Sequence, residues 1–167
     1  MSKWMRILAV VAVVGMVCQA AQAEVKHRVG GGVHYWKAID DLGSDVDSDG
    51  LAPVISYQLR PTSLIKFEAA LEIFPENYGS KDTVYAPELY AILGAGIYGA
   101  VGVGFPMDSA IENFYAFRVG IDLELLPFIY LDVNGNYRFT QWGSWDEITE
   151  DVDTDTITLG AQARIEF

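Results

Sequence analysis

The sequence predicts an all-β fold, a single antiparallel up-and-down barrel of eight strands, and three observations support it. Eight stretches after His27 alternate bulky apolar residues with small or polar ones, which is the two-residue period of a β-strand. The connections between these stretches alternate between tight turns and long polar loops. The first 23 residues differ in composition and lie outside this pattern. We therefore expect one β domain that follows a separate N-terminal segment.

The eight expected strands are roughly ten to fourteen residues long, which suits tilted strands that cross a bilayer. They cover residues 28–39, 50–60, 64–75, 83–94, 97–106, 114–125, 128–141 and 155–167. Tight turns follow the second, fourth and sixth strands, at 60–63, 95–96 and 126–127. The other connections are long and rich in Asp, Glu, Asn, Ser and Gly, and they cover 40–49, 76–82, 107–113 and 142–153. This asymmetry is typical of membrane barrels, whose termini lie on the periplasmic side.

Residues 1–23 have the features of a secretory signal peptide. Lys3 and Arg6 form a basic end, residues 7–18 are apolar, and the small residues Ala21 and Ala23 suit signal peptidase. An apolar run of about twelve residues is too short to span a bilayer, which needs roughly twenty. We expect cleavage after Ala23, export of the chain, and a mature barrel domain over 24–167.

The charge of the expected mature chain limits its partners. Loss of Lys3 and Arg6 leaves nine basic residues against 23 acidic ones and changes the net charge from −12 to −14. Phosphate backbones would be repelled, so nucleic acid is excluded as a partner. The only cysteine, Cys18, lies in the expected signal peptide, so no disulfide is expected.

Alternation alone does not say which face of the barrel meets solvent, because a soluble barrel also has one apolar and one polar face. The volume of the side chains decides between them. One parity is bulky, as in Ile55, Phe67, Leu89 and Phe117, and would overfill the narrow interior of eight strands. The other parity is mostly Gly, Ala and charged residues, which fit inside. We therefore expect an inverted barrel with its apolar face toward lipid.

Charged residues of both signs lie on the parity that is expected to face the lumen. Within a narrow barrel they would have to pair, because an unpaired buried charge costs several kcal/mol. We predict a salt-bridge network that closes the lumen; the alternative is that residues near the mouths are simply hydrated. The predicted network contains Lys66, Glu68, Glu72, Glu88, Arg118, Asp122, Asp132, Arg138 and Arg164.

Aromatic residues cluster toward the ends of the expected strands, where amphipathic rings favour the headgroup region of a membrane. A soluble β-protein also uses aromatic residues, so this signal is weak by itself. The expected belt residues are Tyr35, Trp36, Tyr57, Phe74, Tyr85, Phe105, Tyr115, Phe139 and Trp142.

The last expected strand ends on Phe167, with Ile165 and further apolar residues at every second position before it. This pattern resembles the assembly signal of outer-membrane barrels, and the mature chain resembles small eight-stranded barrels of the OmpA-domain and OmpX type, the outer membrane protein β-barrel family. The resemblance implies a monomer in the outer membrane, in contact with its lipid and lipopolysaccharide, assembled by periplasmic chaperones and the barrel assembly machinery. It implies a structural, envelope-stabilising or surface-interaction role without catalysis, and no catalytic residues carry over.

The first long loop contains a candidate calcium site. Asp45, Asp47 and Asp49 precede Gly50, as in the first half of an EF-hand loop. The bidentate glutamate of an EF-hand is missing, because its position is taken by Ser56 in an expected strand. A looser Ca²⁺ site and a merely solvated acidic loop both remain open, and the acidic loop at 142–153 has the same ambiguity. No other cofactor is expected.

Two rival functions belong to other classes. A small pore for ions or small solutes would need an open lumen. A lipid-modifying enzyme would need a base beside a nucleophile, and only His27 and His34 are available. Residues 94–99 match the glycine pattern of dinucleotide-binding sites, but that site needs a helix at this point and the sequence continues as a strand.

Overall fold

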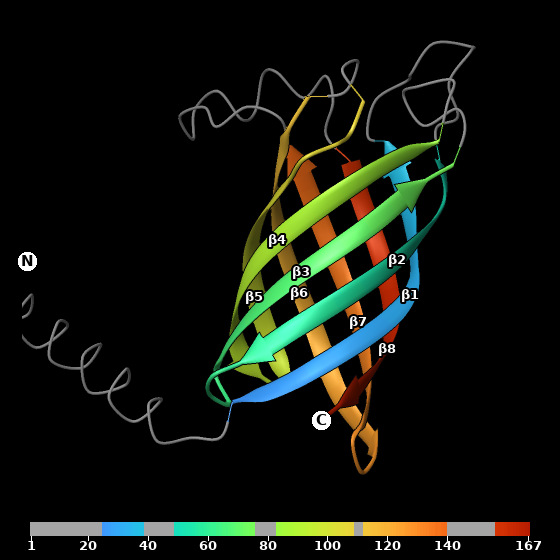
Figure 1. The fold of residues 1–167 in the computed structure, drawn as a ribbon. Coiled ribbons are helices and arrows are strands. Elements are labelled where there is room, and N and C mark those ends of the chain that lie inside the picture. Colours follow the sequence, from blue (N-terminus) through green and yellow to red (C-terminus); the bar gives the residue numbers. More distant parts are fainter. Residues whose placement is uncertain (1–24, 39–48, 76–82, 109–111, 140–155) are drawn as a thin grey trace, which may run out of the picture.

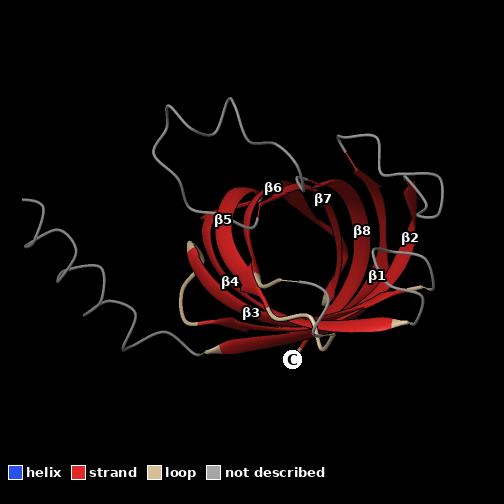
Figure 2. Ribbon diagram, turned by 90° about the horizontal axis from the view of Figure 1, so that it is seen from above, coloured by secondary structure: helices blue, strands red, loops and turns tan. Residues whose placement is uncertain are grey.

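The computed structural model describes residues 25–38, 49–75, 83–108, 112–139 and 156–167. They form eight strands: β1 (Lys26–Ala38), β2 (Asp49–Arg60), β3 (Ile65–Phe74), β4 (Val84–Ala95), β5 (Ile97–Gly104), β6 (Phe114–Leu126), β7 (Ile129–Phe139) and β8 (Thr156–Glu166). Each strand pairs antiparallel with the next, and β8 pairs with β1 to close the barrel (Figures 1 and 2). The predicted fold is confirmed. Among the described residues, no helix is long and apolar enough to cross a membrane.

Three tight turns join the strands at one end of the barrel. Residues 61–64 link β2 to β3, and Gly96, with a φ of 79°, links β4 to β5. Pro127 and Phe128 link β6 to β7. The glycine pattern at 94–99 is therefore a hairpin: Gly94 and Gly96 both have positive φ, which glycine adopts without steric cost. Of the four long connections, those after β1 and β7 lie outside the described residues, and those after β3 and β5 are described in part.

Along the strands the odd-numbered side chains face outward and the even-numbered ones face the lumen, except near strand ends, where Lys26, Glu124 and Leu126 are exposed and Phe139 is buried. Ile55 and Val101 are 57% and 53% exposed, whereas Glu72 and Thr158 are 0% exposed. A water-soluble barrel would have the reverse arrangement. The apolar outer surface and the polar interior are those of a transmembrane barrel.

The interior is filled by large side chains that pack against glycines of the neighbouring strand. Tyr98 occupies the space above Gly120, and Phe114 occupies the space above Gly104, so a Cβ atom at either glycine would overlap a ring. Small residues opposite large ones are how a narrow barrel interior is packed to normal density. The sequence pattern predicted the small residues of the lumen but not these rings.

The prediction that Trp36 and Phe74 belong to a lipid-facing aromatic belt was wrong. Both are even-numbered, point into the lumen and are 2% and 1% exposed. They form an apolar cluster near the loop end of the lumen, which we call the loop-end cluster: Trp36, Ala52, Phe74, Val84, Ala86 and Phe114. Strand parity, not ring chemistry, fixes the face of a side chain, because a strand cannot rotate one residue independently of its neighbours.

The other described belt residues face outward. Tyr35, Tyr57, Tyr85, Phe105 and Tyr115 are exposed on the outer surface. The Phe139 ring is covered by its neighbours: its centroid lies 5.7 Å from that of Tyr115 and 5.4 Å from that of Phe117. Trp142 lies outside the described residues.

Candidate functional site

Most of the charged and polar side chains that are buried in the described residues face the lumen. Along β1 the inward side chains run from Trp36 at the loop end, through His34, to Arg28 at the turn end. The lumen therefore has an apolar layer at the loop end, a charged middle, and a second charged cluster at the turn end.

Glu68 on β3 is the centre of the middle layer. Its carboxylate accepts hydrogen bonds from Arg118 on β6 and Arg164 on β8, each at 2.7 Å, and from Gln58 at 3.1 Å. Neither β6 nor β8 is a neighbour of β3 in the barrel, so both ion pairs cross the lumen. The Arg118 guanidinium also lies 3.7 Å from the centroid of the Tyr90 ring. One carboxylate thus ties three walls of the barrel together.

A second group lies directly below the loop-end cluster. Arg138 on β7 donates to Glu72 on β3 and, at 3.0 Å, to Glu88 on β4. The Nδ1 atom of His34 lies 3.1 Å from Glu72. The Arg138 guanidinium is 5.4 Å and 5.0 Å from the ring centroids of Phe74 and Phe114, so its charge also meets aromatic faces of the loop-end cluster.

Asp132 on β7 completes the middle layer. It accepts hydrogen bonds from the Tyr98 hydroxyl at 2.7 Å and from the Asn134 amide at 2.5 Å, and its other contact is Arg164 at 2.8 Å. Asn136 continues the chain by donating to Asn134. These bonds satisfy polar groups that would otherwise be costly to bury.

The turn-end cluster has a different composition. Asp122 accepts hydrogen bonds from Arg28 at 2.7 Å and Lys66 at 2.8 Å. Glu166 accepts from Arg28 at 2.8 Å, from Lys26 at 2.7 Å and from Arg60. The Lys26 side chain is largely exposed, so this cluster reaches the mouth of the barrel.

The structure places all nine residues of the predicted lumen network inside the barrel and each in contact with an opposite charge. Sequence reasoning left Arg28, Arg60 and His34 out of the network. Their even numbers and polar side chains were the available signal, but Arg28 and Arg60 lie near strand ends, where a hydrated position was equally reasonable.

The candidate calcium ligands are only partly described. Asp45 and Asp47, like the loop at 142–153, lie outside the described residues. Asp49 begins β2 and accepts a hydrogen bond from the Tyr35 hydroxyl at 2.9 Å. Within the described ranges, no group of three or more His, Cys, Asp or Glu residues could hold a metal ion. The expected signal peptide, 1–23, is likewise outside these ranges.

Phe167 lies where the barrel closes. Its backbone exchanges two hydrogen bonds with His27, at 3.1 and 2.9 Å, and its ring stacks on the His27 ring with centroids 5.9 Å apart. His27 Nδ1 in turn lies 2.5 Å from the Tyr57 hydroxyl. Ile165 and Phe167 are both exposed on the outer surface. Their role in assembly stays a prediction.

The histidines offer little for nucleophilic catalysis. His34 is fully buried between Glu72 and Gln162, and Ser56 donates its hydroxyl hydrogen bond to Gln162 at 2.9 Å. His27 lies on the outer surface against two aromatic rings. In the described part of the chain, neither histidine therefore has a hydrogen-bonded serine.

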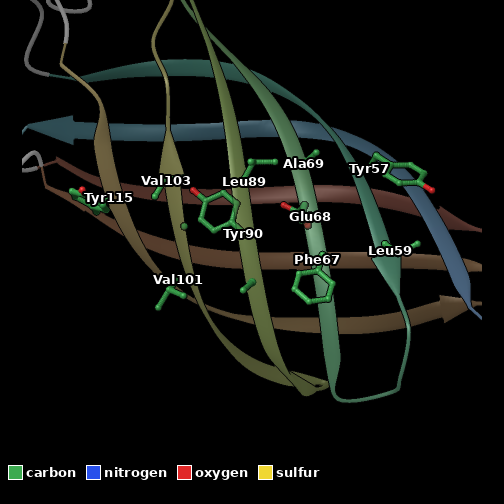
Figure 3. Close-up of a pocket in the computed structure, with 12 residues that line it drawn as sticks. Tyr57, Leu59, Phe67, Glu68, Ala69, Leu89, Tyr90, Val101, Val103 and Tyr115 are labelled. Carbon is green, nitrogen blue, oxygen red and sulfur yellow. The ribbon is translucent and has the colours of Figure 1, made fainter. Parts of the chain in front are cut away.

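Two hollows of the described residues lie on the outside of the barrel. These adjoining hollows of about 650 and 760 Å³ cover β3 to β6, where Ala69, Ala91 and Gly99 leave gaps between bulkier neighbours. Figure 3 shows the first hollow, with Phe67, Leu89, Val101, Val103 and Tyr115 around it. The outward residues are apolar, so these hollows suit hydrocarbon and not a polar substrate.

Comparisons with known proteins place the fold in a class. No protein-family model matches the chain, and no curated protein matches its sequence. Among solved structures, Neisserial surface protein A is 15% identical with a TM-score of 0.54, over 86% of this chain and 97% of that one. The N-terminal β-barrel domain of Pseudomonas aeruginosa OprF is 11% identical with a TM-score of 0.54, over 86% and 97%.

Ail, the attachment invasion locus protein of Yersinia pestis, is 12% identical with a TM-score of 0.53, over 87% of this chain and all of Ail. Ail has also been solved with the heparin analogue sucrose octasulfate. At these identities the likeness shows the fold alone. The fold is that of small eight-stranded outer-membrane barrels, and the fold prediction from the resemblance is confirmed.

Proposed function

We propose that this protein is an integral outer-membrane barrel with a closed lumen, which acts without catalysis by stabilising the envelope through its acidic loops. The inverted barrel is the observation that carries the proposal: ion pairs cross the lumen while bulky apolar residues cover the outside. The expected signal peptide supplies export to that membrane.

The apolar outer surface supports the membrane location. Monomeric soluble proteins rarely expose an apolar patch larger than a few hundred Å². Here apolar residues cover the outer face of every strand, among them Val33, Ile55, Leu89, Val119 and Leu159. Such a surface is stable only when lipid covers it.

The cross-lumen ion pairs support a closed barrel over a pore. Glu68 and Arg138 each bridge strands on opposite walls, and Tyr90 and Tyr98 are buried beside them. An eight-stranded interior is just wide enough for its own side chains. Opposite charges therefore face one another across the lumen and neutralise one another without a continuous water path.

The acidic charge of the loops indicates which partner they would bind. Fourteen of the 23 acidic residues lie in the four expected loop ranges, which contain a single basic residue, Lys81. A sulfated ligand such as the one bound by Ail would be repelled by this charge. We propose instead that divalent cations bridge these carboxylates to the phosphates of lipopolysaccharide, with Asp45, Asp47 and Asp49 among the ligands.

The proposal is tested by unfolding the barrel in vesicles with and without lipopolysaccharide, each in Ca²⁺ or in a chelator. We expect the unfolding midpoint to rise only when lipopolysaccharide and Ca²⁺ are both present. Asp45→Asn with Asp47→Asn should reduce the rise, while Glu124→Gln at the opposite end of the barrel should not. Equal midpoints under all four conditions would contradict the bridging role.

A further inference from the structure

The hairpin of β6 and β7 extends beyond the rest of the turn end (Figure 1). In register, Ile97 at the start of β5 lies opposite Ile121, and the Asp122 N–H donates to the Gly96 carbonyl at 2.7 Å. From there β6 continues to Leu126 with no β5 residue beside it. The last residues of this hairpin are therefore the part of the barrel wall that projects furthest past the Gly96 turn.

Phe128, in the turn of this hairpin, has an unusual backbone. Its φ is 69°, and it is the only non-glycine residue with a positive φ in the described part of the chain. This left-handed region is disfavoured for a bulky residue, and glycine or asparagine would adopt it at lower cost. The Phe128 side chain is nevertheless 64% exposed, so contacts within the barrel do not explain why an aromatic residue occupies this position.

The residues around Phe128 are also apolar and exposed. Leu125 and Leu126 are 57% and 59% exposed, and Ile129 is 38% exposed. We call Leu125, Leu126, Phe128 and Ile129 the apolar tip. Its backbone is held in place by the neighbouring strand, because the Glu166 N–H donates to the Phe128 carbonyl at 2.8 Å. The apolar tip is thus a fixed surface and continues the lipid-facing residues Leu123 and Ile165.

The length of β6 indicates what covers the apolar tip. Tyr115, near the loop end of β6, is an outward aromatic residue whose ring lies beside that of Phe139, and Leu126 follows it by eleven residues. That is about 36 Å along a strand, or about 28 Å along the barrel axis at a tilt of about 40°. The apolar band of a membrane barrel is about 25 Å tall. If Tyr115 lies at one boundary of the hydrocarbon, the apolar tip lies at the other.

We propose that Phe128 is an interfacial anchor: the turn holds its ring at the bilayer boundary of the turn end, and contact with lipid offsets the unfavourable backbone. The partner of the apolar tip is the lipid bilayer, and a protein that docks there is the competing outcome. The inference rests on the proposed membrane location and adds which residues fix the depth of the barrel.

The depth of the apolar tip tests the proposal. In a Cys18→Ala background, Phe128→Cys, Val101→Cys and Glu112→Cys each carry the only thiol. Each variant is labelled with a nitroxide in phosphatidylcholine–phosphatidylglycerol vesicles, and its collision rates with oxygen and with a water-soluble nickel chelate are compared. We expect Val101 in the hydrocarbon, Glu112 in water, and Phe128 between them, at the boundary.

The three labels separate the two proposals. If the label at 128 meets the chelate as often as the label at 112, the apolar tip lies in water and the anchor is refuted, which favours a docking protein. A label at 128 as deep as that at 101 also refutes it. If the label at 101 itself lies in water, the membrane location fails as well.

The backbone of Phe128 gives a second test. A fall or a rise in the stability of the barrel on substitution distinguishes an anchoring ring from one that merely tolerates the strain. Phe128→Gly removes both the ring and the steric cost, whereas Phe128→Leu keeps the cost and an apolar side chain. We expect the ratio of folded to unfolded barrel in urea-treated vesicles to fall severalfold for Phe128→Gly and to change little for Phe128→Leu. If the ring only tolerates the strain, Phe128→Gly should raise the ratio by roughly fivefold. A rise or an unchanged ratio overturns the proposal.

Discussion

The loop-end and turn-end parts of the lumen are lined by the same strands but stabilised differently. Toward the loop end, Arg138 and its two carboxylates lie beneath Trp36, Phe74 and the rest of the apolar cluster. At the turn end, Glu166 meets Lys26, whose side chain is largely exposed at the mouth, and Arg60, whose side chain is 14% exposed. The contribution of an ion pair to stability depends on what can take the place of a lost partner. Water can replace a partner at the turn end, but not beneath the loop-end cluster.

The largest expected effect is in the middle layer. Glu68→Gln removes the one carboxylate shared by Arg118 and Arg164. Both guanidinium groups stay buried, with only Glu88, 3.9 Å from Arg118, and Asp132, 2.8 Å from Arg164, to face them. Loss of one member of a buried ion pair costs about 3–5 kcal/mol, so we expect a decrease of this size in the free energy of unfolding in vesicles. Glu124→Gln, on an exposed side chain, is the control. A loss below about 1 kcal/mol would show that water reaches this layer.

The loop-end cluster should be next in sensitivity. Phe74→Ala removes a buried ring that packs in the apolar cluster and lies over the Arg138 guanidinium. We expect a loss of about 3 kcal/mol in the free energy of unfolding, at the lower end for buried aromatic residues. Phe105→Ala, at an outward position, is the matched control and should cost less. Equal losses would mean that the cluster is not packed as a core.

Substitution at the turn-end cluster should have a smaller effect. Arg60→Gln removes one of three cationic partners of Glu166, and Arg28 and Lys26 remain. Arg60 is only 14% exposed, but Glu166 keeps two other cationic partners, so we expect a loss of about 2 kcal/mol, smaller than that of Glu68→Gln. A loss as large as that of Glu68→Gln would place this cluster in the same dry environment as the middle layer.

The smallest expected effect is on the conduction of ions through the lumen. The wild-type barrel should be silent in planar bilayers, because its ion pairs cross the lumen. A triple variant, Glu72→Ala with Glu88→Ala and Arg138→Ala, removes charge of both signs from one layer and should give at most a small ohmic current, while the remaining layers still restrict the path. Clear single-channel currents from the wild-type protein would falsify the closed lumen and favour a pore.

Much of this protein is determined by the sequence alone. Two-residue alternation predicted the number and order of the strands, because successive side chains of a strand must face opposite sides. The volumes of Phe67, Leu89 and Phe117 then decided which parity faces lipid, since eight strands cannot enclose them. Trp36 and Phe74 are even-numbered, so parity alone would have placed them in the lumen. Their aromatic character instead led to the wrong prediction of a lipid-facing belt.

The tertiary structure decided what the sequence could not. Glu68 meets Arg118 and Arg164 because strand register and the stagger of a closed barrel bring three distant strands to one height, and no spacing within the chain encodes that height. The Tyr98 ring fits inside the barrel because Gly120, opposite it on the neighbouring strand, has no side chain. The left-handed backbone of Phe128 follows from closing a two-residue turn between strands that β8 and the bulge near Glu124 hold in register. Periodicity within one chain fixes the face of a side chain, whereas its partner depends on how all eight strands close together.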